Sequence, residues 1–263
     1  MCLLLWAQRL LKIAIMSHDP VVDSTENQAL LVVCARKTIR HAAILGIVWG
    51  AINSVIGFFA VEATPINAGI LVLGLLMLGT GVIALNKPSI HSLLSEAAVS
   101  VLLLCWNIGI AILNAQSGYG DHVNGHGLIW PAIAAIIFFR QYQRLRHLKE
   151  AIAAMDHAKV KEASDLCKQL FKSKLKQSPD IVEASSRRYR LRLMSGSVFC
   201  AQRNLTQAFH MSRENFKQCI RDLGKKRVSI VVRHPLGKIA SSFDKHNSDK
   251  IKGWLAAPSL PAS

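Results

Sequence analysis

Acidic residues are scarce in this chain of 263 residues, which has 16 Asp and Glu against 32 Lys and Arg. Residues 1–140 hold 7 basic and 6 acidic residues, whereas residues 141–263 hold 25 and 10, so the net charge of +15 lies in the second half. Such an excess attracts phosphate groups, whether on lipid headgroups, nucleotides or nucleic acid. Only 6% of residues are aromatic, which leaves few rings for base stacking and disfavours nucleic acid as the partner.

The chain also lacks the short motifs of common enzyme sites. It has no P-loop, G-x-G-x-x-G, G-x-S-x-G or H-E-x-x-H motif. We therefore predict that the protein is not an enzyme and has no cofactor or metal. An alternative enzyme site at Asp121, His122 and His126, in a glycine-rich loop, would need a bound metal.

The six cysteines include no C-x-x-C pair, and none lies in a segment that we place outside the cell. We expect free thiols in a reducing compartment.

Three long hydrophobic runs dominate the first half of the chain. About 20 apolar residues cross a bilayer, and the three runs that reach this length are 41–61, 65–85 and 93–113. A fourth segment, 123–142, reaches it only with its flanks, where Trp130 and Tyr142 would be interfacial anchors. The sequence therefore predicts a bundle of four transmembrane helices within residues 41–142.

The basic residues around these runs predict the orientation. If there are four spans, the flanking cations all fall on one side, and they are Arg36, Lys37, Arg40, Lys87, Arg140, Arg144, Arg146 and Lys149. The other two loops contain no Lys or Arg, as the positive-inside rule predicts for a multi-pass protein of the inner (plasma) membrane with both ends in the cytoplasm.

Residues 1–40 precede the first span. Residues 1–15 are a poor signal peptide because Arg9 and Lys12 follow the apolar run, so they are either an artefact before a true start at Met16 or an amphipathic interfacial helix. Thr25 and Gln28 have capping-box spacing, which predicts a helix from about Glu26 that bends into the membrane. The alternative is a disordered polar leader.

Small and polar residues within the spans have two interpretations. Gly46, Gly50 and Ser54 share one helix face, and Asn53 and Asn107 could hydrogen-bond across the bundle. We predict that these residues pack the bundle or a homo-oligomer. The alternative is a transporter or channel with a pathway past Asn53, Glu96 and Asn107.

After the spans, residues 143–180 repeat apolar positions at helical spacing and predict an amphipathic helical linker. Residues 181–255 change to short alternating runs, which predict a small basic α+β domain with an antiparallel sheet. These runs are Tyr189–Met194, Val198–Gln202, Leu205–Met211, Arg227–Arg233 and Lys238–Phe243. A closing helix, Ser248–Leu255 with a cap at Asn247 or Ser248, and a disordered tail, 256–263, would follow.

The order of these elements, with a turn at Ser212-Arg213-Glu214 before Phe216 and a final helix ending in Trp254-Leu255, resembles the second half of a pleckstrin-homology-like domain. The whole chain is similar to uncharacterised bacterial membrane proteins that carry such a domain after hydrophobic helices. The resemblance covers Arg188–Leu255, departs in having few strands before Leu205, and implies a fold without implying functional residues.

The densest cations of this domain are the candidate contacts to anionic lipid headgroups or a protein partner: Arg187, Arg188, Arg190, Arg192, Lys225, Lys226 and Arg227. We predict a membrane protein that anchors a basic cytoplasmic interaction or sensing domain at the membrane surface. The alternative is a solvated basic surface that only follows the positive-inside bias.

Overall fold

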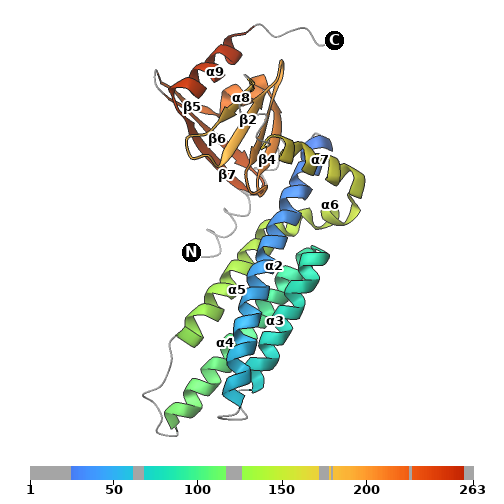
Figure 1. Ribbon diagram of the computed structural model, residues 1–263, viewed down its shortest axis with the longest axis vertical. Coiled ribbons are helices and arrows are strands. Elements are labelled where there is room, and N and C mark those ends of the chain that lie inside the picture. Colours follow the sequence, from blue (N-terminus) through green and yellow to red (C-terminus); the bar gives the residue numbers. More distant parts are fainter. Residues whose placement is uncertain are drawn as a thin grey trace, which may run out of the picture. The chain divides into compact units, whose positions relative to one another are not determined.

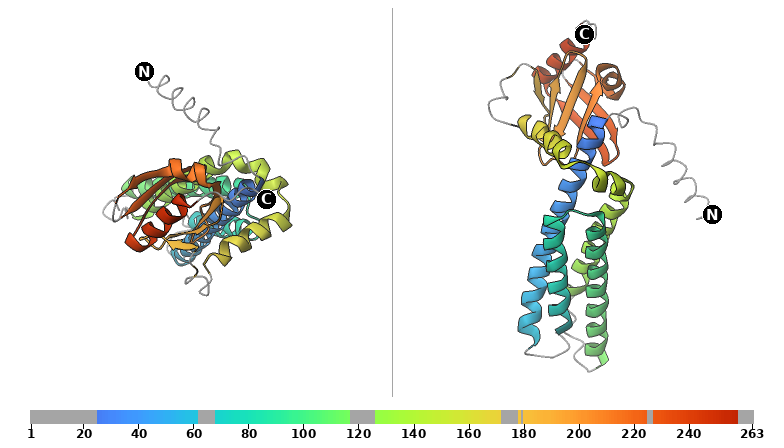
Figure 2. Two further views of the ribbon diagram at one scale, coloured as in Figure 1. Left: turned by 90° about the horizontal axis from the view of Figure 1, so that it is seen from above. Right: turned by 90° about the vertical axis from the view of Figure 1, so that its right-hand side faces the viewer.

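The computed structural model describes residues 25–61, 68–116, 126–171, 178, 180–224 and 227–257. The chain divides into two compact units (Figures 1 and 2). Ala35–Ala154 belong to a helical unit, whereas residues 25–34 belong with the described residues from Met155 onward to a strand-containing unit. The predictions for residues 1–15, for Met16 and for most of the C-terminal tail lie outside the described residues.

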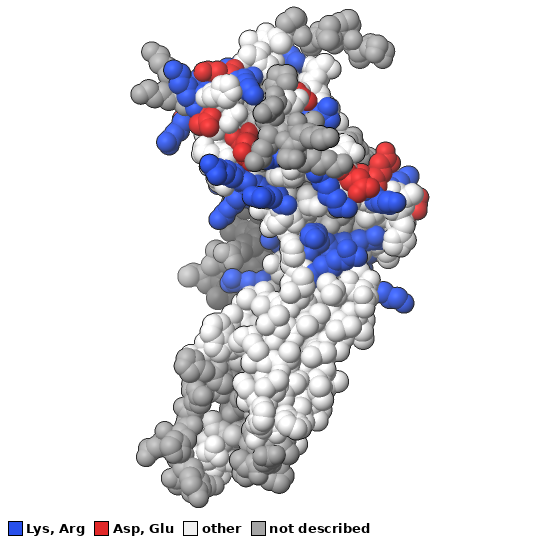
Figure 3. Space-filling model, viewed as in Figure 1, with Lys and Arg blue, Asp and Glu red and all other residues white. Residues whose placement is uncertain are grey.

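The helical unit is built from long helices that lie side by side (Figure 2). They are α2 (Thr25–Val61), α3 (Ala68–Asn86), α4 (Ile90–Gln116) and α5 (His126–Leu145), followed by the short η4 (Arg146–Leu148) and α6 (Lys149–Ala154). Many outward-facing side chains are large and apolar, such as Phe59, which is 67% exposed. On the face shown in Figure 3, most of the length of the bundle carries no charged side chain. This is the surface expected of helices that contact lipid.

Three helical stretches are long and apolar enough to cross a membrane: Asn27–Phe59, Ala68–Asn86 and Ile90–Gln116. They contain nearly all of the three long runs predicted from the sequence. The predicted fourth span corresponds to α5, which is not among the three; its last turns contain the polar residues Arg140, Gln141, Gln143 and Arg144. The helix predicted to begin near Glu26 begins at Thr25 and forms one element with the first span, so residues 25–40 are not a disordered leader.

The strand-containing unit has two antiparallel sheets. The first has the order β1 (Ile181–Glu183), β2 (Tyr189–Leu193), β3 (Ser197–Gln202) and β4 (Ala208–Ser212). The second has the order β5 (Ile220–Leu223), β6 (Val228–His234) and β7 (Gly237–Phe243). Besides residues 25–34 of α2, the described part of this unit contains the helices α7 (His157–Gln169), α8 (Arg213–Cys219) and α9 (Lys245–Ala256).

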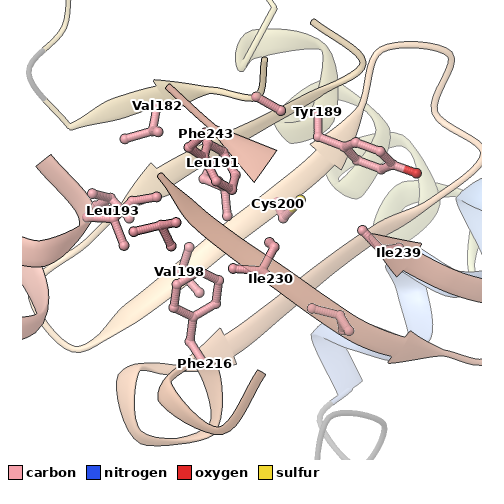
Figure 4. Close-up of a cluster of buried hydrophobic side chains, with 14 of the residues drawn as sticks. Val182, Tyr189, Leu191, Leu193, Val198, Cys200, Phe216, Ile230, Ile239 and Phe243 are labelled. Atoms are coloured by element: carbon pink, nitrogen blue, oxygen red, sulfur yellow. The ribbon is translucent and has the colours of Figure 1, made fainter. Parts of the chain in front are cut away.

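The core lies between the two sheets, where side chains from both meet (Figure 4). Leu191 and Leu193 alternate along β2, as Ile230 and Val232 do along β6, because every second residue of a strand points to the same face. Phe216 from α8 joins this core. The alternation predicted from the sequence therefore corresponds to two facing sheets rather than one.

The first residues of α2 and the end of α7 lie against the first sheet. Asn27 in the first turn of α2 donates a hydrogen bond from Nδ2 to the carbonyl of His210 at 2.8 Å and accepts one from the backbone N–H of His210 at 2.8 Å. This pairing covers the edge of β4, which would otherwise present free backbone groups. Residues 29–35 of α2 are all buried, as is Cys167 on α7.

Several local predictions are wrong in their details. The segment predicted as a turn at Ser212-Arg213-Glu214 begins α8, because the Ser212 hydroxyl accepts a hydrogen bond from the Asn215 N–H and caps the helix. The closing helix begins after Asp244, its actual cap, whereas Ser248 is buried and bonds the Val228 N–H. β1 and β5 were not predicted, and β1, β2 and β3 all precede Leu205, so the expected shortage of strands there does not hold.

Candidate functional site

Two turns at one end of the first sheet line an open, basic hollow of about 450 Å³. Three arginines line it, together with one hydroxyl and two amide side chains: Ser186, Arg187, Arg188, Gln202, Arg203 and Asn204. Ser186–Arg188 follow β1, and Arg203–Asn204 follow β3, so the antiparallel order of the strands brings both turns to the same end. We call this set of six residues the arginine hollow.

Backbone hydrogen bonds hold the two turns together. The Arg187 N–H donates to the carbonyl of Ala184 at 2.8 Å, and the Arg203 N–H donates to the carbonyl of Arg188 at 2.8 Å, which joins one turn to the other. Arg187 has a φ of 54° and Leu205 a φ of 58°, in the left-handed region that costs about 1–2 kcal/mol for a residue with a Cβ. Strained residues of this kind often occur at ligand sites.

The three arginines of the hollow are charged groups without a paired carboxylate. The ion pairs within the described residues join Lys168 to Asp165, Arg190 to Glu183 and Arg192 to Asp180, and none reaches the hollow. Arg187, Arg188 and Arg203 are exposed to solvent. A planar guanidinium donates to phosphate or carboxylate oxygens in pairs, so the hollow can bind an anionic group.

The structure separates the arginines that the sequence grouped together. Arg190 is 5% exposed, bonds Glu183 at 3.0 Å and the carbonyl of Leu170 at 3.2 Å, and lies over the ring of Phe171. It therefore faces the covered side of the first sheet and is not part of a binding surface.

Arg192 is exposed but bonds Asp180 at 2.9 Å. Burial acts to raise the pKa of Asp180, but hydrogen bonds from Ser178 and Arg192 outweigh it and lower the pKa overall. Arg227 is exposed before β6, and no described contact joins it to the arginine hollow, while Lys225 and Lys226 lie outside the described residues.

Sequence reasoning missed Arg203, Gln202 and Asn204. Gln202 ends β3, and Arg203 and Asn204 follow it; Arg203 is a single cation outside any basic run, so the density of charge gave no signal. Only the pairing of β2 with β3 places them beside Arg188.

Within the helical unit, the small residues lie where α2 and α3 meet. A Cβ on Gly50 would lie 2.5 Å from the backbone N of Leu78, and one on Gly74 would lie 2.6 Å from that of Ser54. Close approach of the helix backbones requires glycine at these positions. Gly46 lies instead against the carboxyl group of Glu96, which is on α4.

The polar residues of the alternative transport pathway do not form one described network. The Asn53 side chain donates to the carbonyl of Trp49 in its own helix at 2.8 Å rather than across the bundle. Glu96 accepts a hydrogen bond from Thr80 on α3 at 3.0 Å, and Asn107 is half-buried on α4.

The thiols and histidines do not form a reactive centre in the described part of the chain. Cys34, Cys167 and Cys200 are buried. Burial raises the pKa of Cys167 to about 12, and burial together with Cys167 raises the pKa of Cys200, so these thiols stay protonated and unreactive. Among the described residues, no three His, Cys, Asp or Glu side chains could hold a metal.

The alternative metal site cannot be located in this structure. Asp121 and His122, together with the side chain of His126, lie outside the described residues.

Comparison with protein-family models, curated proteins and solved structures finds no match to this chain.

Proposed function

We propose that this chain is a four-span protein of the inner (plasma) membrane, not an enzyme, that holds a basic cytoplasmic domain at the membrane surface to bind an anionic lipid headgroup. The arginine hollow is the observation that carries the proposal. The architecture, the domain and the ligand are supported by separate observations.

The segments that make up the strand-containing unit support an even number of membrane crossings. This unit combines residues 25–34, which precede the first span, with residues that follow α5. Asn27 bonds His210 across 183 positions of the sequence, so both must lie on the same side of a membrane. Three crossings would separate them, whereas a fourth crossing by α5 keeps them together. The cations at the cytoplasmic ends of the predicted spans favour the cytoplasm for both.

The domain is proposed to be pleckstrin-homology-like. Four strands and three strands form two facing antiparallel sheets, and α9 closes the domain with Ile251 in the core. The resemblance seen in the sequence concerned the same order of strands and final helix. The helix α8 between β4 and β5 is an addition to that pattern.

The ligand is proposed from the chemistry of the arginine hollow. Its three exposed guanidinium groups match the oxygens of a phosphate, and hydroxyl and amide side chains beside them can donate further hydrogen bonds. Each cation near an anionic leaflet contributes about 1 kcal/mol. Three therefore contribute about 3 kcal/mol, on the order of a 100-fold change in affinity.

The test uses the full chain in a neutral detergent, because residues 25–34 belong to the domain. Lipid binding is counted by native mass spectrometry with phosphatidylglycerol, with phosphatidylcholine and with soluble glycerol phosphate. Arg187, Arg188 and Arg203 are all replaced by Gln. The matched control replaces three exposed cations elsewhere in the same domain by Gln: Lys217, Arg221 and Lys245.

We expect phosphatidylglycerol to bind in preference to phosphatidylcholine, and the hollow variant to lose on the order of 100-fold in affinity while the control loses much less. Equal losses in both variants would mean that only net charge matters and would refute the hollow. Tight binding of glycerol phosphate without the lipid would indicate a soluble phosphate ligand instead of a headgroup.

A further inference from the structure

One acidic side chain lies inside the helical bundle. Glu96 on α4 is the single Asp or Glu in the described stretches 27–61, 68–86, 90–116 and 126–145, and it is 1% exposed. Its Oε1 accepts a hydrogen bond from the Thr80 hydroxyl at 3.0 Å, while its Oε2 has no hydrogen-bond partner among the described residues. Ionisable groups buried within membrane helices are rare and are usually functional.

Helix α2 leaves room for this carboxyl group at a single residue. A Cβ added to Gly46 would lie 2.7 Å from Oε1 of Glu96 and 2.8 Å from its Oε2. A side chain at position 46 would displace the carboxyl group of Glu96 from this place. The carboxyl group is therefore enclosed by α2, α3 and α4.

No cation balances Glu96 within the described residues, since the three ion pairs there all belong to the strand-containing unit. The other charged or titratable residues on these helices of the helical unit have no described bond to Glu96: Arg36, Lys37, Arg40 and His41 on α2, Lys87 after α3, His91 and Cys105 on α4, and Arg140, Tyr142 and Arg144 on α5. A buried carboxylate without a paired cation is strongly disfavoured, so a neutral acid fits this position better.

Thr80 supplies the partner that a neutral acid needs. Its hydroxyl lies 3.0 Å from the carbonyl of Met77 and 3.0 Å from Oε1 of Glu96, but it has one hydrogen to donate. If Thr80 donates to Met77, its oxygen can accept the proton of a Glu96 carboxylic acid. The three groups then form a continuous chain of hydrogen bonds.

We propose that Glu96, Thr80 and Gly46 form a proton-binding site within the helical bundle, in which Glu96 carries an exchangeable proton at neutral pH. The exchange makes and breaks only the O–H bond of the carboxyl group, and water is the source and acceptor of the proton. A hard metal cation fits this site less well than a proton. Such an ion is coordinated by six or more oxygens, whereas the described contacts of this carboxyl group supply one hydroxyl.

The site is tested on the full chain in detergent by infrared spectroscopy, which separates the carbonyl band of a protonated carboxyl from the bands of a carboxylate. We expect the wild-type protein to show the acid band at neutral pH and to lose it reversibly in alkali. Glu96→Gln should abolish this band. Sodium at constant ionic strength should not shift the titration.

A wild-type spectrum with carboxylate bands alone at neutral pH, or an acid band that persists in Glu96→Gln, would overturn the proposal. A titration that moves with sodium concentration would replace the proton by a metal cation. If Glu96→Gln does not fold, Thr80→Val gives the second test, because it removes the acceptor of the acid and must shift the band.

Discussion

Replacement of Asn27 by Ala should loosen the first sheet, although Asn27 lies more than 180 positions away from that sheet's strand β4 in the sequence. The Asn27 amide exchanges two hydrogen bonds of 2.8 Å with the backbone of His210 on β4, and its side chain is 7% exposed. Each bond contributes a net 0.5–1.5 kcal/mol, so loss of both costs about 2 kcal/mol. Asn27→Asp keeps the acceptor but places a carboxylate against the His210 carbonyl, so we expect at least the same cost.

Hydrogen exchange followed by mass spectrometry on the full chain in detergent measures this cost directly. Opening of β4 becomes easier by about 2 kcal/mol, which corresponds to roughly 30-fold faster exchange of the β4 amides. Gln28→Ala is the matched control, because Gln28 lies on the same turn and is exposed. Exchange of β4 in Asn27→Ala at the rate of the Gln28 control would refute the assignment of α2's first turn to this unit.

Three further predictions concern packing, charge and pH. Gly50→Ala should lower the melting temperature in detergent because its Cβ meets the α3 backbone, whereas Gly79→Ala, with nothing within 4 Å, should not. Arg190→Gln should cost about 2–3 kcal/mol of unfolding free energy in denaturant titration because it breaks a largely buried ion pair, whereas Arg187→Gln should change binding and not stability. Burial raises the pKa of Cys167 to about 12 in the folded state, against about 8.5 in the unfolded state. The stability that the neutral thiol gives is therefore fully present below a pH of about 8.5 and is lost as the pH rises toward 12. Cys167→Val should reduce this fall of the melting temperature at alkaline pH.

The helical part of the fold could be predicted because a bilayer demands long apolar runs, and these are visible without knowledge of contacts. The alternating runs of β2, β3 and β6 could also be predicted, because every second side chain of a strand points to the same face of the sheet. The assignment of residues 29–34 to the strand-containing unit could not be predicted. Their apolar run is separated from the predicted first span only by residues 36–40, and the β4 edge that pairs with Asn27 at the start of α2 follows more than 170 positions later.

The candidate site was predicted only in part, because charge density does not reveal which face of a strand is covered. Arg187 and Arg188 lie in a turn and line the arginine hollow, but Arg190 lies on a strand whose outer face meets the end of α7. Arg203 lies in the hollow because β2 pairs with β3, which brings it beside Arg188. Contacts of this kind depend on the register of β2 and β3, which a single sequence does not state.

The most direct test of the account is the side of the membrane on which the strand-containing unit lies. Cys2 is replaced by Ala, as are Cys105 and Cys219, which are not fully buried, and the buried thiols of Cys34, Cys167 and Cys200 are retained. Single cysteines are then introduced at Ser117, between α4 and α5 in the sequence, and at Lys245 in α9. Intact cells are treated with a maleimide that cannot cross the membrane, and permeabilised cells serve as the control.

Four crossings with both ends in the cytoplasm predict that the cysteine at position 117 is labelled in intact cells and that the cysteine at position 245 is labelled only after permeabilisation. Labelling at position 245 in intact cells would contradict the account, because the strand-containing unit would then lie outside.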